Sequence, residues 1–455
     1  MIYGMKKPLP PGLAWTGRKY PASGLQFHYN FWSEMDGETV WEDGLFQKLY
    51  KIIDEAESFI VLDQFLFNNY YQEEVEYPEI AERLVNNLIK KKEAYPEMQI
   101  VFISDPVNTA YGSHESPQLK RLEEKGIEVV LTDLHQLRDS NPVISGFWRS
   151  YFQWFGTSGK GWLPHAMSEK RPPVTLRSYL KMLNLKANHR KVIYTDREAL
   201  VSSANPHDAS AYFNNIGFSA KGGIIDDGLA SEQSVASFSG GFELPQRSEK
   251  MKRADEHEEE ATILLMTEKS TYRNVRSLIK GTAAGDHIRL AVLYLSDVPL
   301  IKDLLQAAHR GVHIDIIFDQ NKEAFGQKKI GIPNKPVAKK LMRHTNGLLN
   351  VRWYETKGEQ FHTKMMLVES QGRMTAVAGS ANFTRRNMKN FNLDASVRVE
   401  GPVDTPALSD AKRYFDRLWS NEDAECTLPY DSRKQEGWWL TAIYLLQKAT
   451  NTSTY

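Results

Sequence analysis

The sequence contains almost no cysteine: Cys426 is the single one among 455 residues, so the fold cannot depend on internal disulfides or on a zinc site made of cysteines. Net charge is also missing, because 57 lysines and arginines balance 57 aspartates and glutamates. There is therefore no global field to hold a polyanion such as duplex DNA, although local basic patches are compatible with this balance. The length leaves room for two or three domains with sizeable cores.

Long apolar runs are absent as well. No window reaches the roughly 18 to 20 apolar residues that a membrane-spanning helix needs, and the most apolar stretch near an end, 438–446, has about half that length. Residues 1–12 contain lysines and prolines but no apolar segment of the signal-peptide kind. We therefore expect an extended segment over 1–25, which is also what would follow an anchor that had been removed.

Helix and strand patterns alternate along both halves of the chain. In the first half, apolar spacing predicts helices over 45–56, 80–92 and 118–125, and strands over 59–62, 98–103 and 127–131. The second half repeats this order, with helices over 274–280, 300–309 and 337–343, and strands over 288–293, 313–318 and 349–353. The alternation favours an α/β fold, and the repeated order predicts an internal duplication of about half the chain.

A mixed run of charges, 246–260, lies between the halves and predicts a solvated linker. We therefore expect a first domain over 26–245 and a second over 261–455. Only the first contains an insert, 139–188, in which aromatic and basic side chains are interleaved. Its aromatic residues are Phe147, Trp148, Tyr151, Phe152, Trp154, Phe155, Trp162 and Tyr179, and its basic residues are Arg149, Lys160, Lys170, Arg171, Arg177, Lys181 and Lys186.

Three uses of this insert are open. Amphipathic helices in an anionic membrane interface would place the rings at headgroup depth, whereas a single-strand channel would stack nucleic acid bases on them. The third use is a lid whose aromatic side chains complete the core beside a site. Trp438 and Trp439 also fit the membrane interpretation, but a terminal helix that packs on the core explains them equally well.

Two copies of one short pattern carry the chemistry. His189 and Lys191 stand two residues apart, as do His362 and Lys364. Residues two apart on a strand point to the same face, so each pair projects together. From the lysine to a later asparagine is 14 residues in the first copy (191 to 205) and 18 in the second (364 to 382). If both segments are hairpins, the even difference leaves the facing of the side chains unchanged.

The groups in these copies suit a phosphodiester. The two lysines, the amides of Asn205 and Asn382, and the hydroxyls of Ser203 and Ser380 are donors for the non-bridging oxygens and for charge that develops at phosphorus. One imidazole can attack phosphorus to form a phosphohistidine. The other can protonate the leaving oxygen and then deprotonate the incoming alcohol or water. This chemistry needs no metal and no cofactor.

The pattern resembles the paired His-x-Lys motifs of the phospholipase D superfamily, and most resembles bacterial cardiolipin synthases, over about residues 26–419. The second copy, with the run Gly379-Ser380-Ala381-Asn382, matches well, whereas the first has Ser202 where the family usually has glycine. The acidic residue five positions after the lysine is Asp196 in the first copy and Glu369 in the second. The resemblance implies that this residue supports the structure rather than the reaction.

The resemblance also implies a fold and a function. The fold is a pair of similar α/β/α sandwich domains in a pseudo-twofold arrangement with one site at their interface, where His189 is the nucleophile and His362 the general acid and base. The function is metal-independent transfer or hydrolysis of phospholipid diesters, with peripheral contact to an anionic membrane. A nuclease of the same superfamily is the alternative enzyme, and a binding module with a degenerate site is the alternative that is not an enzyme.

Carboxylates at the ends of predicted strands are lesser candidates. Asp63, Asp105 and Asp319 either orient a ligand hydroxyl or a catalytic imidazole, or cap the following loop. Arg385 and Arg386, which follow the second motif, are candidates for its rim.

Overall fold

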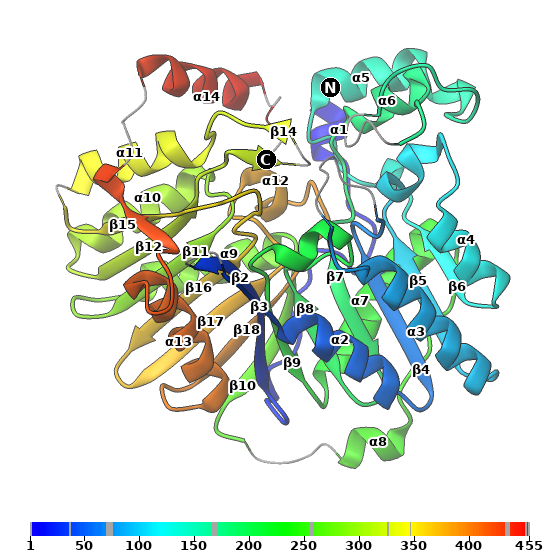
Figure 1. Ribbon diagram of the computed structural model, residues 1–455, viewed down its shortest axis with the longest axis horizontal. Coiled ribbons are helices and arrows are strands. Elements are labelled where there is room, and N and C mark those ends of the chain that lie inside the picture. The colour runs from blue at the N-terminus through cyan, green and yellow to red at the C-terminus, as the bar shows by residue number, and fades with distance from the viewer. Residues whose placement is uncertain are drawn as a thin grey trace.

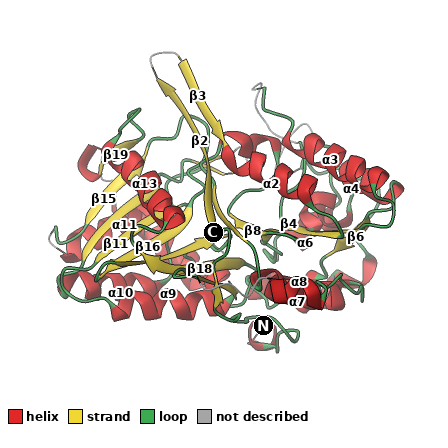
Figure 2. Ribbon diagram, turned by 90° about the horizontal axis from the view of Figure 1, so that it is seen from below, coloured by secondary structure: helices red, strands yellow, loops and turns green. Residues whose placement is uncertain are grey.

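The computed structural model describes residues 2–35, 38–69, 76–165, 171–254, 259–324, 327–345, 347–432, 437–450 and 453. Within this part of the chain, two large mixed sheets lie side by side, one from each half (Figure 1). Helices cover both faces of the sheets (Figure 2). The predicted α/β/α architecture is therefore confirmed.

The first sheet has the strand order β3-β2-β9-β8-β7-β4-β5-β6. Its strands are β2 (Gln26–Met35), β3 (Glu38–Asp43), β4 (Phe59–Gln64), β5 (Gln99–Ser104), β6 (Glu128–Leu131), β7 (Lys191–Thr195), β8 (Ala199–Ser202) and β9 (Ile216–Ala220). Along β4, Ile60 and Leu62 pack under the helices α2 (Gly44–Glu55), α3 (Ile80–Ala94) and α4 (Pro117–Glu124). Val61 faces the other way, toward α7 (Ile224–Ser239). The run is apolar throughout because both of its faces are covered.

The second sheet has the order β1-β10-β18-β17-β16-β11-β12-β15-β19. Its strands are β1 (Tyr20–Pro21), β10 (Thr262–Thr267), β11 (His287–Val292), β12 (His313–Asp319), β15 (Asn350–Tyr354), β16 (Lys364–Ser370), β17 (Arg373–Gly379), β18 (Ala395–Pro402) and β19 (Thr427–Pro429). The helices α9 (Lys269–Gly281), α10 (Val298–His309) and α11 (Asn334–Thr345) cover one face, and α13 (Pro406–Ser420) covers the other.

The strand pairing repeats between the sheets. In the first, β4 pairs parallel with β5 and antiparallel with β7, and in the second β11 pairs parallel with β12 and antiparallel with β16. The second motif hairpin, β16 with β17, is longer than the first, β7 with β8, as predicted. One apolar core contains residues of both halves, including Phe218 and Tyr414, whose rings both contact Phe27. We call the boundary where β8 and β9 meet β17 and β18 the seam.

The N-terminal segment differs from the expectation of an extended chain over 1–25. It begins with the helix α1 (Ile2–Lys6), and the carbonyl of Gly4 accepts a hydrogen bond from Asp139 in the insert. Farther along, β1 pairs with β10 of the second sheet. The segment therefore crosses from the insert to the second half, and its backbone groups find partners there instead of in water.

The insert and the linker contain short elements. The insert forms α5 (Pro142–Tyr151) and α6 (Leu176–Met182), and the linker forms α8 (Glu249–Ala254). Residues 166–170 of the insert and 255–258 of the linker lie outside the described residues. Of the aromatic side chains predicted for the insert, Trp148 is buried, whereas Phe147, Tyr151, Trp154, Phe155 and Trp162 are exposed. A lid that completes the core accounts for the buried Trp148 but not for the exposed aromatic side chains.

One pair of facing positions explains the serine at position 202. Ser202 of β8 pairs with Gly217 of β9, whereas Gly379 of β17 pairs with Ser396 of β18. A Cβ on Gly379 would lie 2.3 Å from the carbonyl oxygen of Ala395, and a Cβ on Gly217 would lie 2.9 Å from the Cβ of Ser202. Each pair therefore contains one glycine, on opposite strands in the two halves.

We predict that Gly379→Ser destabilises the protein by about 1–3 kcal/mol because its side chain meets packed backbone, and that adding Ser396→Gly recovers part of this loss. Denaturant unfolding measures both effects. Gly281→Ser is the control, because no atom lies within 4 Å of its Cβ position. Equal stability of Gly379→Ser and the control would contradict the packing argument.

Candidate active site

The two histidines lie at the seam, each just before a strand. Because β7 begins at Lys191 and β16 at Lys364, the His-x-Lys pattern straddles the start of the strand instead of lying inside it. The backbone N–H of His189 donates to the carbonyl of Leu393 in the second half, 2.8 Å away. The first motif is thus attached to the backbone of the other half.

Each imidazole is held by a side chain from the other half. Nδ1 of His189 lies 2.8 Å from Oδ1 of Asp394, and Nδ1 of His362 lies 2.8 Å from Oδ1 of Asn215. Because these oxygens accept, Nδ1 carries the proton and Nε2 keeps a lone pair for chemistry. The exchange of partners joins both halves in one site.

Sequence reasoning missed these two partners. Asp394 directly precedes β18 and Asn215 directly precedes β9, so they occupy equivalent places in the two sheets. The available signal was a polar residue at the start of the apolar strand that follows each motif. It does not reveal that the partner belongs to the opposite histidine, because that contact exists only across the seam.

The two serines of the motifs bind the residues that hold the histidines. The hydroxyl of Ser203 donates to Oδ1 of Asn215 at 3.2 Å, and that of Ser380 donates to Oδ1 of Asp394 at 2.9 Å. The single hydroxyl proton of each serine is therefore committed to the residue that holds a histidine. The two hydroxyls thus support the imidazole partners, and their predicted role in binding phosphate stays a prediction.

The side chains of the two motif asparagines, in contrast, have no hydrogen-bond partner among the described residues. Asn205 and Asn382 make no hydrogen bond through their side chains to any described residue, and Oδ1 of each is buried. The Nδ2 groups, which are the donors of these amides, therefore remain available to a ligand at equivalent positions of both halves. Their predicted role in binding phosphate stays a prediction that this geometry favours.

The two lysines are buried beside the histidines. Each ammonium donates to the carbonyl of the histidine two residues before it, at 2.9 Å for Lys191 and 2.8 Å for Lys364. An ammonium has three N–H donors, so two remain on each lysine for a ligand. Burial lowers the pKa of Lys191 to about 7, and burial followed by the charge of Lys191 lowers the pKa of Lys364 well below its ordinary value.

Burial and the nearby cations keep both imidazoles neutral. Burial, followed by the charge of Lys191, lowers the pKa of His189 to about 4, while Asp394 acts in the opposite direction. The pKa of His362 is lowered well below its ordinary value, first by burial and then by the two lysines and the other histidine. Groups from both halves thus influence each other within one site. An anion bound there would offset the crowded positive charge.

Carboxylates at strand ends position the chain before each histidine. Oδ2 of Asp105 accepts from the backbone N–H of Asn188 at 2.7 Å, and Oδ2 of Asp319 accepts from that of Phe361 at 2.8 Å. Asp105 also caps the turn after β5 through the N–H of Val107. Asp105 therefore caps the following loop, one of the two predicted alternatives, whereas neither carboxylate hydrogen-bonds to an imidazole; each instead holds the backbone of the residue before a histidine.

The acidic residues five positions after the lysines make supporting contacts. Oδ1 of Asp196 accepts from the backbone N–H groups of Glu57 and Ser58, each at 3.0 Å. Glu369 forms an ion pair with Arg289 at 2.9 Å. They lie at the far ends of the motif strands, away from the histidines.

The described residues form neither a metal cluster nor a membrane-spanning helix. They contain no group of three or more histidine, cysteine, aspartate or glutamate side chains arranged to hold a metal ion. None of their helices combines the length and the apolar character needed to cross a bilayer.

Comparison with known proteins gives one family match. Residues 276–419 match the family model described as cardiolipin synthase, PLD-like domain. No curated protein sequence matches the chain.

Solved structures are similar over different shares of the chain. Phosphatidylserine synthase from Haemophilus influenzae Rd KW20 has a TM-score of 0.56 and 10% identity, over 95% of this chain and 94% of that one, which shows a shared fold. Polyphosphate kinase from Porphyromonas gingivalis has a TM-score of 0.47 and 14% identity, over 94% of this chain and 53% of that one. The phospholipase D family member Nuc from Salmonella typhimurium has a TM-score of 0.29 and 20% identity, over 38% of this chain and 99% of that one.

We predict that Asn215→Asp raises the pKa of His362, because a carboxylate beside Nδ1 favours the charged ring. Titration of histidine-labelled protein by NMR, with His362→Ala to assign the signal, measures this change. Asn350→Asp, at an exposed position of β15, is the control. A pKa of His362 that stays unchanged or falls in Asn215→Asp would contradict the arrangement.

Proposed function

We propose that this chain, of which residues 276–419 match a PLD-like family model, transfers phospholipid diesters through a covalent phosphohistidine. The observation that carries this proposal is the pair of imidazoles at the seam, each held through Nδ1 by a residue of the other half. Each ring can thereby offer Nε2 to one shared phosphorus atom. This is the arrangement that a nucleophile and a separate proton carrier require.

The two partners assign the two roles. His189 is paired with the carboxylate of Asp394, which stabilises the positive charge that the ring acquires when Nε2 bonds to phosphorus. His362 is paired with the neutral amide of Asn215, which gives a charged ring less stabilisation and so eases release of its proton. His189 is therefore the nucleophile, and His362 is the general acid and base.

The reaction then has two balanced steps. As the bond between Nε2 of His189 and phosphorus forms, the bond to the leaving oxygen breaks, and that oxygen takes the proton from Nε2 of His362. Water or an alcohol next gives a proton to His362 and attacks phosphorus, which frees His189. Because the anionic substrate offsets the charges of Lys191 and Lys364, its binding raises the pKa of His362 and favours the protonated ring that the first step needs.

The donors that surround the phosphorus come equally from both halves. The remaining N–H groups of the two lysines and the amides of Asn205 and Asn382 would bind the non-bridging oxygens. These groups are buried, so their interaction with charge that develops in the transition state is stronger than in water.

The exposed aromatic side chains favour a lipid substrate. Trp154 and Trp162 of the insert are 75% and 70% exposed, and Trp438 at the start of α14 (Trp438–Thr450) is 81% exposed. The insert helices and α14 lie along the same edge of the molecule (Figure 1). Rings beside basic residues suit the headgroup region of an anionic bilayer. We therefore propose peripheral membrane contact through this edge.

A small cavity lies between the insert, the segment that follows the second motif, and α14. It has a volume of about 100 Å³ and lies between Ser140 at the start of the insert, Arg385 and Arg386 after the motif, and Tyr444 and Lys448 of α14. The start of the insert and α14 thus both line this cavity.

We predict that the protein, in EDTA, converts phosphatidylglycerol vesicles to diphosphatidylglycerol or phosphatidic acid. His189→Ala and His362→Ala should each lower the rate by on the order of 10³-fold or more, because the two rings act as a unit. His313→Ala, at an exposed position of β12, is the control.

Single-stranded DNA is the second substrate in the same assay. Nicking of DNA without lipid turnover would replace the lipid proposal by a nuclease of the same superfamily. Full activity in either active-site variant would contradict the mechanism with two histidines.

We predict that Trp154→Ala combined with Trp162→Ala weakens cosedimentation with anionic vesicles, because the exposed rings no longer enter the interface. Tyr95→Ala is the control, since Tyr95 is 53% exposed but follows α3, outside the insert. Equal binding by both variants, or binding that salt does not weaken, would count against this surface.

A further inference from the structure

We propose that Glu268 is a positioning residue for His189 and that it acts through Asp394 and Arg190 across the seam. Glu268 lies between β10 and α9, far in sequence from both motifs, and nothing in the sequence pattern singles it out. This inference rests on the proposed reaction at His189. It is tested below by a signal that does not require turnover.

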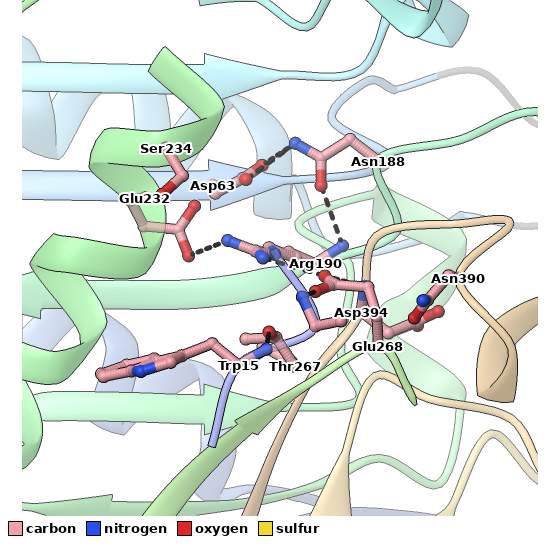
Figure 3. Close-up of polar contacts among 12 residues, drawn as sticks. Trp15, Asp63, Asn188, Arg190, Glu232, Ser234, Thr267, Glu268, Asn390 and Asp394 are labelled. Carbon is pink, nitrogen blue, oxygen red and sulfur yellow. Dashed lines mark hydrogen bonds and ion pairs between the residues drawn. The ribbon is translucent and has the colours of Figure 1, made fainter. Parts of the chain in front are cut away.

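The carboxylate of Glu268 is fully buried and joins three segments of the chain. Oε1 accepts from the guanidinium of Arg190 at 2.9 Å and from the backbone N–H of Asp394 at 3.3 Å. Oε2 accepts from the backbone N–H of Ala14 at 2.6 Å. Figure 3 shows Glu268, Arg190 and Asp394 gathered in this way. One side chain thus fixes the first motif, the partner of its histidine and the N-terminal segment.

The backbone of Asp394 is bound to Glu268 on both sides. Besides the bond from its N–H, its carbonyl accepts from the backbone N–H of Glu268 at 3.1 Å. Glu268 itself has a φ of +45°, a strained conformation for a residue other than glycine, and these contacts hold it there. Because the carboxylate of Asp394 bonds Nδ1 of His189, a shift of Glu268 would be transmitted to the ring.

Arg190 connects Glu268 directly to the motif strand. It stands between His189 and Lys191, and its side chain points away from the site, as strand alternation predicts. The guanidinium is fully buried and donates to Glu232 of α7 as well as to Glu268, at 2.9 Å in both cases. A planar guanidinium with two carboxylates has one preferred orientation, so it sets the position of the strand that carries His189.

A second contact steadies this side of the site. The amide of Asn188 donates to both carboxyl oxygens of Asp63, at 2.8 and 2.7 Å (Figure 3). Burial, followed by the charge of Glu232, raises the pKa of Asp63 well above its ordinary value. Asp63 thus anchors the side chain of Asn188, the residue that directly precedes His189.

The equivalent region of the other half is neutral. Thr363 occupies the position of Arg190, and its hydroxyl contacts the carbonyl of Asn214 at 3.0 Å and the hydroxyl of Tyr414 at 2.9 Å. Hydroxyl groups are thus sufficient to hold the motif strand beside His362. The charged cluster occurs beside His189, where the proposed reaction generates a positive ring. This asymmetry assigns Glu268 to the nucleophile rather than to general packing.

The test compares Glu268→Gln with Glu198→Gln. Glu198 forms a buried ion pair with Lys48 at 2.8 Å, at the far end of the first hairpin, so it controls for loss of a buried charge. The readout is the downfield proton resonance of the His189 Nδ1–H in protein without substrate, assigned with His189→Ala. We expect this resonance to move upfield or disappear in Glu268→Gln and to remain in Glu198→Gln.

Kinetics give a second readout. Glu268→Gln should lower kcat on the order of 100-fold with KM unchanged, because misplacement of the nucleophile affects the chemical step. Arg190→Lys keeps the charge but not the planar fork, and we expect the same loss of kcat from it. This variant also serves if Glu268→Gln does not fold.

An unchanged His189 resonance in Glu268→Gln, or in Arg190→Lys if the first variant does not fold, would overturn the proposal. So would equal losses of kcat in Glu268→Gln and Glu198→Gln. If the protein transfers no phosphodiester at all, the proposed reaction fails, while the resonance still decides whether Glu268 positions His189.

Discussion

The structure depends on one interaction that occurs twice: each active-site imidazole donates from Nδ1 to a side chain of the other half. Neither half contains a complete site, because each histidine is held by a residue of the other half: His189 by Asp394, and His362 by Asn215. The seam therefore has to be closed for the chemistry to exist. Its closure is secured by the shared apolar core, by the backbone bond from His189 to Leu393, and by buried charges that cross between the halves.

Duplication has produced two similar halves whose surroundings differ in charge. Beside His189 stand Asp394, Glu268 and Arg190, whereas beside His362 stand an amide and hydroxyl groups. The same burial lowers the pKa of both imidazoles, so burial cannot separate their roles. The carboxylate of Asp394 separates their roles, because it stabilises a positively charged imidazole at His189 only. The exchange of glycine and serine between facing strands shows the same pattern, in which equivalent positions of the two halves meet one requirement with different residues.

The sequence predicted features that depend on local pattern. Periodicity located the helices and strands to within a few residues, and the repeated His-x-Lys placed four of the groups that meet at the seam. The contacts across the seam could not be predicted from this local pattern. The partners of the histidines, the hydrogen bonds of Ser203 and Ser380, and the course of the N-terminal segment along β10 all depend on which surfaces pack together. Arg190 illustrates the limit: alternation predicted that it points away from the site, but not that two buried carboxylates receive it.

The most direct test of the account is to identify the residue that bonds to phosphorus. His362→Ala protein would be mixed with phosphatidylglycerol, quenched and digested, and its peptides analysed by mass spectrometry. Loss of the base should slow release, so we expect a phosphatidyl adduct to accumulate on the peptide that contains His189. The same peptide from His189→Ala should carry none. An adduct on His362 in the wild-type protein, or lipid turnover with no adduct on either histidine, would contradict the account.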